Sequence, residues 1–344
     1  MRQVECQGTS YEIGYQHGRE AKTEIAAGIE FYRRLFLESN KLTWPQVGEV
    51  ADKFIPFLLG KWPDLYSEIQ GVAAGAGQPI SSILALNVRT EIAFGMFSDG
   101  CTALSWKDGT TSLLAQNWDW QQEQEANLIR LRIKQVGKPN IDMITEAGII
   151  GKIGLNSTGV GVCLNATRAE GVDFGRLPCH LALRTCLNSN SRAEAIAALQ
   201  EAGVASSCHI LVADPEGGTG IECSSVDIVL IPMCDKGMVT HTNHFVDEHP
   251  GVEENVLFKD SGPRLTRIGE LVKTARPDVV SVRRLLEDED GYPTSINRQR
   301  THGSTIATLF SIVMQLDKAY ADVRIGRPTE AERYLKLQPD PEEV

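Results

Sequence analysis

The sequence lacks the apolar segments that would place a protein in or across a membrane. No apolar run approaches the roughly 18 residues that a membrane-spanning helix needs. The N-terminus, Met1-Arg2-Gln3-Val4-Glu5, has no apolar stretch of the signal-peptide type. The last residues, Asp340-Pro341-Glu342-Glu343-Val344, do not form a peroxisomal tripeptide. We therefore expect a cytoplasmic protein with no membrane partner.

Paired cysteine motifs and concentrated positive charge are also absent. The eight cysteines form no C-x-x-C pair and no disulfide framework, so we expect free thiols in a reducing compartment. The formal net charge is −11, and no cluster of Lys and Arg offsets it. This balance argues against a nucleic-acid partner, because nucleic-acid surfaces are basic. We find no internal repeat and no low-complexity linker.

The first hundred of the 344 residues have a helical pattern. Ile25, Ile29, Tyr32 and Phe36 recur at the spacing of one helix face. Further helices are expected from Thr43 onward, around 65–77 and around 80–92, with Gly75-Ala76-Gly77 as a helix breaker. We expect residues 1–100 to be a helical segment.

From Cys101 the hydrophobic period changes from helical spacing to two. Strands are expected at 101–106, 111–119, 129–133, 141–145, 149–154, 159–164, 208–212, 220–224, 226–231, 238–242, 304–313 and 319–325. Helices are expected at 178–187, 192–202, 263–274 and 279–286, and the longest loop at 246–261. Short turns between successive strands favour antiparallel pairing. The prediction is an α+β fold with two antiparallel sheets between helical layers.

The change of pattern occurs at Ser98-Asp99-Gly100-Cys101-Thr102. An Asp-Gly turn at 108–109 makes the following strands a hairpin. A cysteine that opens a strand directly after a glycine suits an N-terminal nucleophile, whose thiol first attacks the Gly100 carbonyl and breaks the Gly100–Cys101 bond. The freed α-amine, with a reference pKa of about 7.7–8.0, then serves as the base for its own thiol. The alternative is that Cys101 is a small buried core residue.

Asn117 and Asp119 are polar residues inside an otherwise apolar strand. They share one face by the period of two, and the hairpin is expected to bring that face beside Cys101. A carboxylate there would orient the new ammonium group. The alternative is hydrogen bonding at the end of a strand.

Further polar candidates end or open strands. In His241-Thr242-Asn243-His244, the two histidines could bind a metal, the Asn243 amide could donate to an oxyanion, or the segment could be a plain turn. No carboxylate or thiol stands at a supporting spacing, so we expect no metal. Ser224 and Ser304 are candidates whose alternative is strand-edge hydrogen bonding. The glycines at 148–161 lack the G-x-G-x-x-G spacing, which argues against a dinucleotide site.

The motifs resemble those of the fungal acyl-CoA:6-aminopenicillanic-acid acyltransferase (isopenicillin N acyltransferase) family. The resemblance covers residues 6–328 nearly throughout. The matching segments are Cys6-Gln7-Gly8-Thr9, Glu12-Ile13-Gly14-Tyr15, Asn87, Arg89-Thr90-Glu91, Asp99-Gly100-Cys101-Thr102, Gln116-Asn117-Trp118-Asp119, Asn127-Leu128, 145–152, 241–244, Ala307-Thr308-Leu309-Phe310 and Gly326-Arg327-Pro328.

The resemblance implies an N-terminal-nucleophile fold of four layers, αββα. It implies a precursor that cuts itself into a small subunit, 1–100, and a large subunit, 101–344, which stay together as an αβ heterodimer and form one structural domain. By matching position, Cys101 is the nucleophile, Asp119 supports processing and catalysis, and Asn243 helps hold the oxyanion.

The resemblance also implies substrates and the residues that bind them. The substrates are a β-lactam, isopenicillin N or 6-aminopenicillanic acid, and an acyl-CoA thioester, with no cofactor. Ser224 and Ser304 match serines tied to activity and acyl-thioester handling. Thr305 stands where the penicillin-forming enzyme has an arginine, so the charge of the substrate pocket differs.

Together with the missing peroxisomal tail, the change at Thr305 indicates a paralogue. Two other interpretations remain open at this point. One is an amidohydrolase that transfers acyl groups only to water, and the other is an unprocessed paralogue that binds ligands without catalysis.

Overall fold

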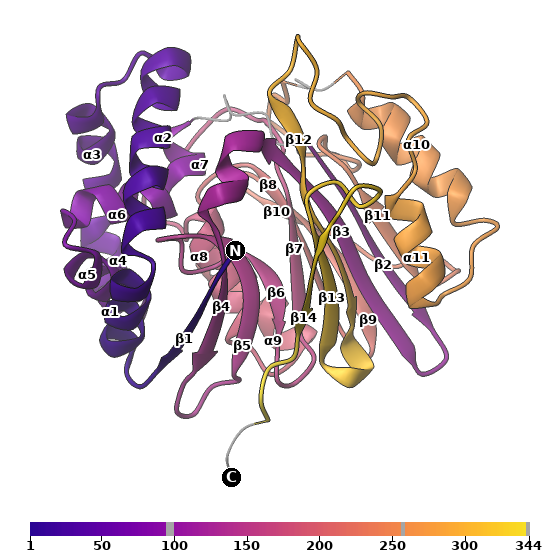
Figure 1. Ribbon diagram of the computed structural model, residues 1–344, viewed down its shortest axis with the longest axis horizontal. Helices are drawn as coiled ribbons and strands as arrows, with labels where there is room; N and C mark the ends of the chain where they lie inside the picture. The colour runs from indigo at the N-terminus through magenta and orange to yellow at the C-terminus, as the bar shows by residue number, and fades with distance from the viewer. Residues whose placement is uncertain (94–99, 256–258, 342–344) are drawn as a thin grey trace.

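Two β-sheets form the centre of the molecule. The computed structural model describes residues 1–93, 100–255 and 259–341 (Figure 1). The eight-stranded sheet has the order β1 (Arg2–Gln7), β4 (Leu128–Lys134), β5 (Ile141–Glu146), β6 (Ile153–Asn156), β7 (Gly161–Asn165), β8 (Cys208–Asp214), β9 (Gly217–Cys223) and β10 (Ile228–Ile231). The six-stranded sheet has the order β11 (Met238–His241), β2 (Gly100–Asp108), β3 (Thr111–Gln121), β12 (Ile306–Gln315), β13 (Tyr320–Ile325) and β14 (Arg333–Leu337).

Helices cover the outer faces of both sheets. The first part of the chain forms α1 (Ser10–Glu20), α2 (Lys22–Asn40), α3 (Trp44–Asp52), α4 (Ile55–Lys61), α5 (Pro63–Ala76), α6 (Ile80–Asn87) and α7 (Arg89–Ile92). The later helices are α8 (Cys179–Leu187), α9 (Arg192–Ala202), α10 (Ser261–Leu271) and α11 (Val279–Leu286). Figure 1 shows α1–α7 on one side and α10 with α11 on the other, with the sheets between them.

The contacts between elements confirm the expected four-layer order, αββα. The two sheets face each other where β2 and β3 contact β7 and β9. Helix α8 packs on β6, β7 and β8, whereas α10 and α11 pack on β11, β2, β3 and β12. Short 3₁₀ turns, Gln122–Asn127 and Leu316–Lys318, follow β3 and β12. The observed fold is therefore the predicted α+β arrangement.

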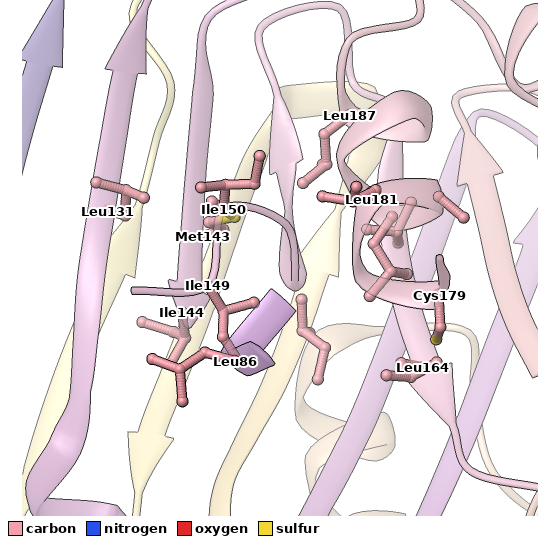
Figure 2. Packing of buried hydrophobic residues seen from close by; sticks show 14 of the residues in the cluster. Leu86, Leu131, Met143, Ile144, Ile149, Ile150, Leu164, Cys179, Leu181 and Leu187 are labelled. Carbon is pink, nitrogen blue, oxygen red and sulfur yellow. The ribbon is translucent and has the colours of Figure 1, made fainter. Parts of the chain in front are cut away.

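Buried aliphatic side chains join the eight-stranded sheet to its helices. Figure 2 shows Leu86 of α6 beside Ile144 of β5, and Met143 of β5 with Leu181 and Leu187 of α8 belongs to the same buried cluster. All five are at most 1% exposed. Removal of this much apolar surface from water favours the layered packing.

Strand β1 corrects the expectation that residues 1–100 are only helical. It pairs in parallel with β4, with Val4 opposite Leu131 and Cys6 opposite Ile133. Val4 and Cys6 are buried, and the residues between them are exposed. This strand was not predicted from the sequence. Its alternating pattern is short and has no turn residues beside it, and a helical pattern follows directly.

Two further segments differ from expectation. The predicted strand at 149–154 begins only at Ile153, because Gly148 has φ +93° and the Ile149 amide turns back to the Glu146 carbonyl. Strand β14 was not predicted; it pairs with β13 from Ala321 to Ile325 at the edge of the sheet. No described helix combines the length and apolar character that crossing a bilayer requires.

Glycines bring α1 and α5 into backbone contact. A Cβ on Gly14 or Gly18 of α1 would lie 2.0 Å from the Glu68 carbonyl oxygen or 2.2 Å from that of Val72. A Cβ on Gly71 or Gly75 of α5 would meet backbone oxygens of α1 at 2.2 and 2.1 Å. Gly75 is thus a packing residue within α5 and not the predicted breaker, since the helix continues to Ala76 and ends at Gly77, where φ is +64°.

We expect Gly71→Ala to destabilise the fold by about 1–3 kcal/mol, because the new methyl group would force the two helix backbones apart. Gly28→Ala is the matched control: Gly28 also lies inside a helix, but nothing lies within 4 Å of the added Cβ. Alanine has the better helix propensity there, so this control should be neutral or slightly stabilising. Thermal unfolding measures both, and equal melting temperatures for the two variants would contradict the close-contact explanation.

Candidate active site

The β2–β3 hairpin places the predicted nucleophile. The turn at Gly109, where φ is +52°, sets a register in which Gly100 lies opposite Asp119 and Cys101 lies opposite Trp118. Cys101 is fully buried, and its side chain faces the space between the sheets together with that of Trp118. Burial raises the pKa of the Cys163 thiol on β7, and the nearby Cys101 raises it further. Ser98 and Asp99 of the predicted motif lie outside the described residues.

The register corrects the expectation that the Asn117/Asp119 face lies beside the Cys101 side chain. Cross-strand partners share a face, so Asp119 shares its face with Gly100. A Cβ on Gly100 would lie 2.8 Å from Asp119 Oδ2 and 2.8 Å from Arg298 Nε. The carboxylate therefore lies against the residue before the candidate scissile bond, and only glycine leaves room for it there.

Asn117 and Asp119 also have different partners. Asn117 Nδ2 donates to the carbonyls of Leu286 and Ile296, at 2.8 and 3.0 Å. These bonds tie the strand to α11 and the loop after it. Among the described residues, Asn117 therefore holds β3 against α11 and the loop that follows it.

Asn243 reaches Cys101 from the end of β11. Pairing of β11 with β2 ends at His241, opposite Ala103. Two residues later, Asn243 Oδ1 accepts a hydrogen bond of 2.9 Å from the Cys101 backbone N–H, and Asn243 Nδ2 donates to the Ala166 carbonyl at 3.0 Å. The Asn243 oxygen therefore takes the place of a strand partner at Cys101. In these contacts it faces the nitrogen that would become the α-amine.

Two buried arginines extend the site, and the sequence interpretation missed both. Arg264 on α10 donates to the Cys101 carbonyl at 2.6 Å and to Asn243 Oδ1 at 2.7 Å. Arg298 donates to Asp119 Oδ2 at 3.3 Å. Asp260 pairs with both arginines. In the sequence these arginines resemble ordinary surface residues of a helix and a loop, and the only available signal is that Asp260 and Arg264 are four residues apart.

Asp119 is a carboxyl group with a perturbed pKa. Its Oδ1 accepts a 2.7 Å hydrogen bond from Thr308 Oγ1 of β12. Burial raises the pKa of Asp119 to about 6, although the positive charges of Arg298 and Arg264 and the Thr308 hydrogen bond lower it. A carboxyl group that titrates near neutrality between two strands is typical of an active site.

The two predicted serines have local hydrogen-bond partners. Ser224 is buried at the end of β9, where its hydroxyl donates to Asp227 Oδ1 and accepts from the Val226 and Asp227 amides at 3.1 Å. Ser304 Oγ accepts from the Ile306 amide at 3.3 Å. These bonds serve turns, as the alternative interpretation of both serines expects.

Thr305 borders two cavities, of about 280 and 660 Å³. Arg300 and Gln122 line both of them, and the Gln122 amide donates to the Thr305 carbonyl at 3.0 Å. Gln122 directly follows β3, three residues after Asp119. The cavities therefore lie beside the end of the strand that carries Asp119.

His241 and His244 point to different partners. His241 Nε2 lies 2.7 Å from Glu222 Oε1, and His244 Nδ1 lies 2.7 Å from Ser261 Oγ. Within residues 1–93, 100–255 and 259–341, no group of three or more His, Cys, Asp or Glu side chains has a geometry that could hold a metal ion.

We expect a carbon-13 NMR titration of Asp119 in Cys101→Ala protein to give a pKa of about 6. Because the folded-state pKa lies above the ordinary value of 3.8, the folded state binds this proton more tightly than the unfolded state does. The contribution of Asp119 to stability is therefore full below pH 3.8 and is lost as the pH rises to about 6. Arg298→Gln should raise the pKa further, and an unchanged value in that variant would contradict the electrostatic coupling.

Comparisons with known proteins agree with this architecture. The family model described as acyl-coenzyme A:6-aminopenicillanic acid acyl-transferase matches residues 106–330. The chain is 40% identical over 333 residues to the acyl-coenzyme A:6-aminopenicillanic-acid-acyltransferase 40 kDa form of Emericella nidulans. The aligned region covers 95% of this chain and 93% of that protein.

A solved structure supports the fold. A mutant of the conjugated bile acid hydrolase from Clostridium perfringens superposes with a TM-score of 0.51 at 13% identity, covering 69% of this chain and 92% of that chain. That likeness, with the αββα layers, identifies the N-terminal-nucleophile hydrolase fold. On the family match and the 40% identity over almost its whole length, the chain belongs to the acyl-coenzyme A:6-aminopenicillanic acid acyltransferase family.

Proposed function

We propose that this protein is a self-processing acyltransferase whose nucleophile is Cys101. The observation that carries the proposal is the hydrogen bond from the Cys101 backbone nitrogen to Asn243 Oδ1, with Asp119 and Arg298 packed against Gly100. This geometry holds the nitrogen on one side of the candidate scissile bond and a carboxyl group on the other. Self-cleavage requires that the leaving nitrogen and the carbonyl side of the bond are both held in place.

The first reaction is cleavage of the Gly100–Cys101 bond. The Cys101 sulfur attacks the Gly100 carbonyl carbon, the C–N bond breaks and the thiol proton passes to the nitrogen, so that a thioester and a free α-amine form. Water then hydrolyses the thioester, which leaves a Gly100 carboxylate and restores the thiol. Asn243 Oδ1 already faces this nitrogen and would orient the amine as the base for the thiol.

The second reaction is acyl exchange at the same sulfur. The Cys101 thiolate attacks an acyl-CoA thioester or the side-chain amide of isopenicillin N, and CoA thiol or amine leaves with a proton. The resulting acyl-enzyme passes its acyl group to the amine of 6-aminopenicillanic acid, or to water. Arg264 donates to the Cys101 carbonyl and Arg298 pairs with Asp119, so both place positive charge beside Cys101, where it would favour a transition state that carries an oxyanion.

Buried polar contacts would keep the two products of self-cleavage together. Asn87 donates to the Gly148 carbonyl at 2.8 Å and accepts from the Ile150 amide at 2.9 Å. Glu68 and Arg184 form a buried ion pair at 2.7 Å. Together with the β1–β4 pairing, these contacts join the small subunit, 1–100, to the large one, 101–344.

The cavities beside Thr305 are the proposed site for an anionic group of the substrates. The anionic groups are the β-lactam carboxylate and the CoA phosphates. Arg300 lines both cavities and has no ion pair among the described residues. It would supply positive charge near the position where Thr305 replaces an arginine of the penicillin-forming enzyme.

We expect intact-mass spectrometry of denatured protein to find two polypeptides, 1–100 and 101–344, that elute together under native conditions. Cys101→Ala should remain one chain without turnover, because it has no attacking sulfur. Asp119→Asn should slow processing at least tenfold and remove an acidic limb centred near pH 6 from its pH profile. A cut Cys101→Ala chain would overturn the nucleophile assignment, and a wild-type chain that stays whole would favour a binding paralogue.

Arg300→Gln should raise the KM for 6-aminopenicillanic acid by several-fold to tenfold, because an exposed charge-assisted contact contributes about 1 kcal/mol. Arg34→Gln is the matched control, since Arg34 borders only the smaller cavity and is already paired with Glu123. Mass spectrometry of the products separates the alternatives. Acylated amine supports the transferase, whereas free acid alone supports an amidohydrolase that uses only water.

A further inference from the structure

A buried cluster of charged side chains lies behind Asn243, outside the centre described above. Glu222 of β9 is fully buried, and its carboxylate contacts four groups, one on the last residue of β11 and three in the segment that follows. Its Oε1 lies 2.7 Å from His241 Nε2 and accepts from the Val246 amide at 2.6 Å. Its Oε2 accepts from the Asp247 amide at 3.2 Å and lies 3.4 Å from His249 Nε2. One carboxylate thus spans residues 241–249, and Asn243 lies within that span.

The cluster joins the two sheets. Glu222 belongs to the eight-stranded sheet, whereas His241 ends β11 of the six-stranded sheet. The His241 ring stacks on His209 of β8, with ring centroids 3.5 Å apart and planes 9° apart. The segment that carries Asn243 is therefore also held from the opposite sheet, through His241.

Each histidine ring of the cluster lies between two oxygen acceptors. His241 Nδ1 faces the Thr242 carbonyl at 2.9 Å while its Nε2 faces Glu222. His249 Nδ1 faces Asp227 Oδ1 at 2.8 Å while its Nε2 faces Glu222. Because carbonyl and carboxylate oxygens accept, a ring nitrogen must carry a hydrogen to bond to one of them. The two rings therefore link Glu222 to Thr242 on one side and to Asp227 on the other.

Ser224 is attached to the far end of this cluster. Its hydroxyl donates to the same Asp227 oxygen that faces His249. The series Ser224, Asp227, His249, Glu222 and His241 therefore leads to the residue two positions before Asn243. Through these contacts Ser224 can affect the position of residues 241–243 without touching the substrate.

We propose that Glu222, with His241 and His249, is a positioning residue that holds Asn243 Oδ1 against the Cys101 nitrogen, and that Ser224 acts through it. The proposal rests on the proposed function, in which that nitrogen must be oriented. Glu222 touches no reacting atom. It acts through the hydrogen bonds that fix residues 241–249.

The first test measures positioning without chemistry. In uncut Cys101→Ala protein, the amide of residue 101 should be protected from hydrogen exchange by its bond to Asn243 Oδ1. Glu222→Gln should lower this protection at least tenfold. Its side-chain NH2 would replace the oxygen that faces the Asp247 amide and His249, and an NH2 group cannot accept their hydrogens, so residues 241–249 would be held less firmly. Glu254→Gln is the matched control: Glu254 accepts only one bond from the same segment, from the Phe245 amide at 2.7 Å, and an amide oxygen preserves it.

The second test compares self-cleavage by Glu222→Gln and Glu222→Ala, a pair that separates the hydrogen bonds of residue 222 from the mere presence of its carboxylate. The side-chain amide of Glu222→Gln keeps one oxygen that can accept from the Val246 amide, whereas alanine keeps no acceptor. Self-cleavage should therefore be faster in Glu222→Gln than in Glu222→Ala, and equal rates would contradict a role through these hydrogen bonds.

His249→Phe provides a second variant in case replacement of the fully buried Glu222 prevents folding. It keeps the ring that stacks on Phe245, with centroids 4.0 Å apart, and removes both N–H donors. We expect slower self-cleavage and weaker protection of residue 101, with a melting temperature within a few degrees of wild type.

The outcomes separate this inference from the proposed function. Folded Glu222→Gln and His249→Phe proteins with wild-type protection and wild-type cleavage would overturn the positioning role while leaving self-processing intact. A wild-type chain that stays whole, but whose residue 101 loses protection in both variants, would overturn self-processing and support the positioning role.

Discussion

The pairing register of β2 against β3 is the constraint on which the site depends. It places Gly100 opposite Asp119 and directs Cys101 into the space between the sheets. A slip of one residue would exchange the two faces, so that Cys101 would point toward α10 and the carboxylate toward the core. The turn at Gly109, the burial of Trp118 and the pairing of β3 with β12 all hold the same register.

Around that hairpin the protein buries charge instead of avoiding it. Arg264 and Arg298 are at most 3% exposed; both pair with Asp260, and Arg298 also pairs with Asp119. Such a set is weak evidence for stability, since desolvation of each ion costs several kcal/mol. Removal of one member would leave its partner charged and buried, at a cost of about 3–5 kcal/mol. The arrangement is better explained by the electric field it provides at the Cys101 carbonyl and the Gly100 side of the bond.

The two sheets have different tasks at this centre. The six-stranded sheet carries Cys101 and Asp119, and β11 leads to Asn243. The eight-stranded sheet carries Glu222, which contacts His241 at the end of β11. The surroundings of Cys101 therefore depend on how the two sheets lie against each other.

The sequence by itself determined the layers, the hairpin and Cys101, because local periodicity and turn chemistry are encoded in neighbouring residues. It also identified Asp119 and Asn243 as polar residues in unusual places. The tertiary structure decided what these residues meet: Asp119 faces Gly100 and not the thiol, and the oxygen of Asn243 faces the Cys101 nitrogen. Arg264 and Arg298 emerge only there, because contacts between residues more than a hundred positions apart, such as Cys101 with Arg264 or Asp119 with Arg298, leave no local pattern. The contacts of Glu222 span only 19 to 27 positions, but they cross from one sheet to the other and leave no local pattern either. The parallel strand β1 and the glycine contact of α1 with α5 are hidden for the same reason, since each depends on a partner distant in the chain.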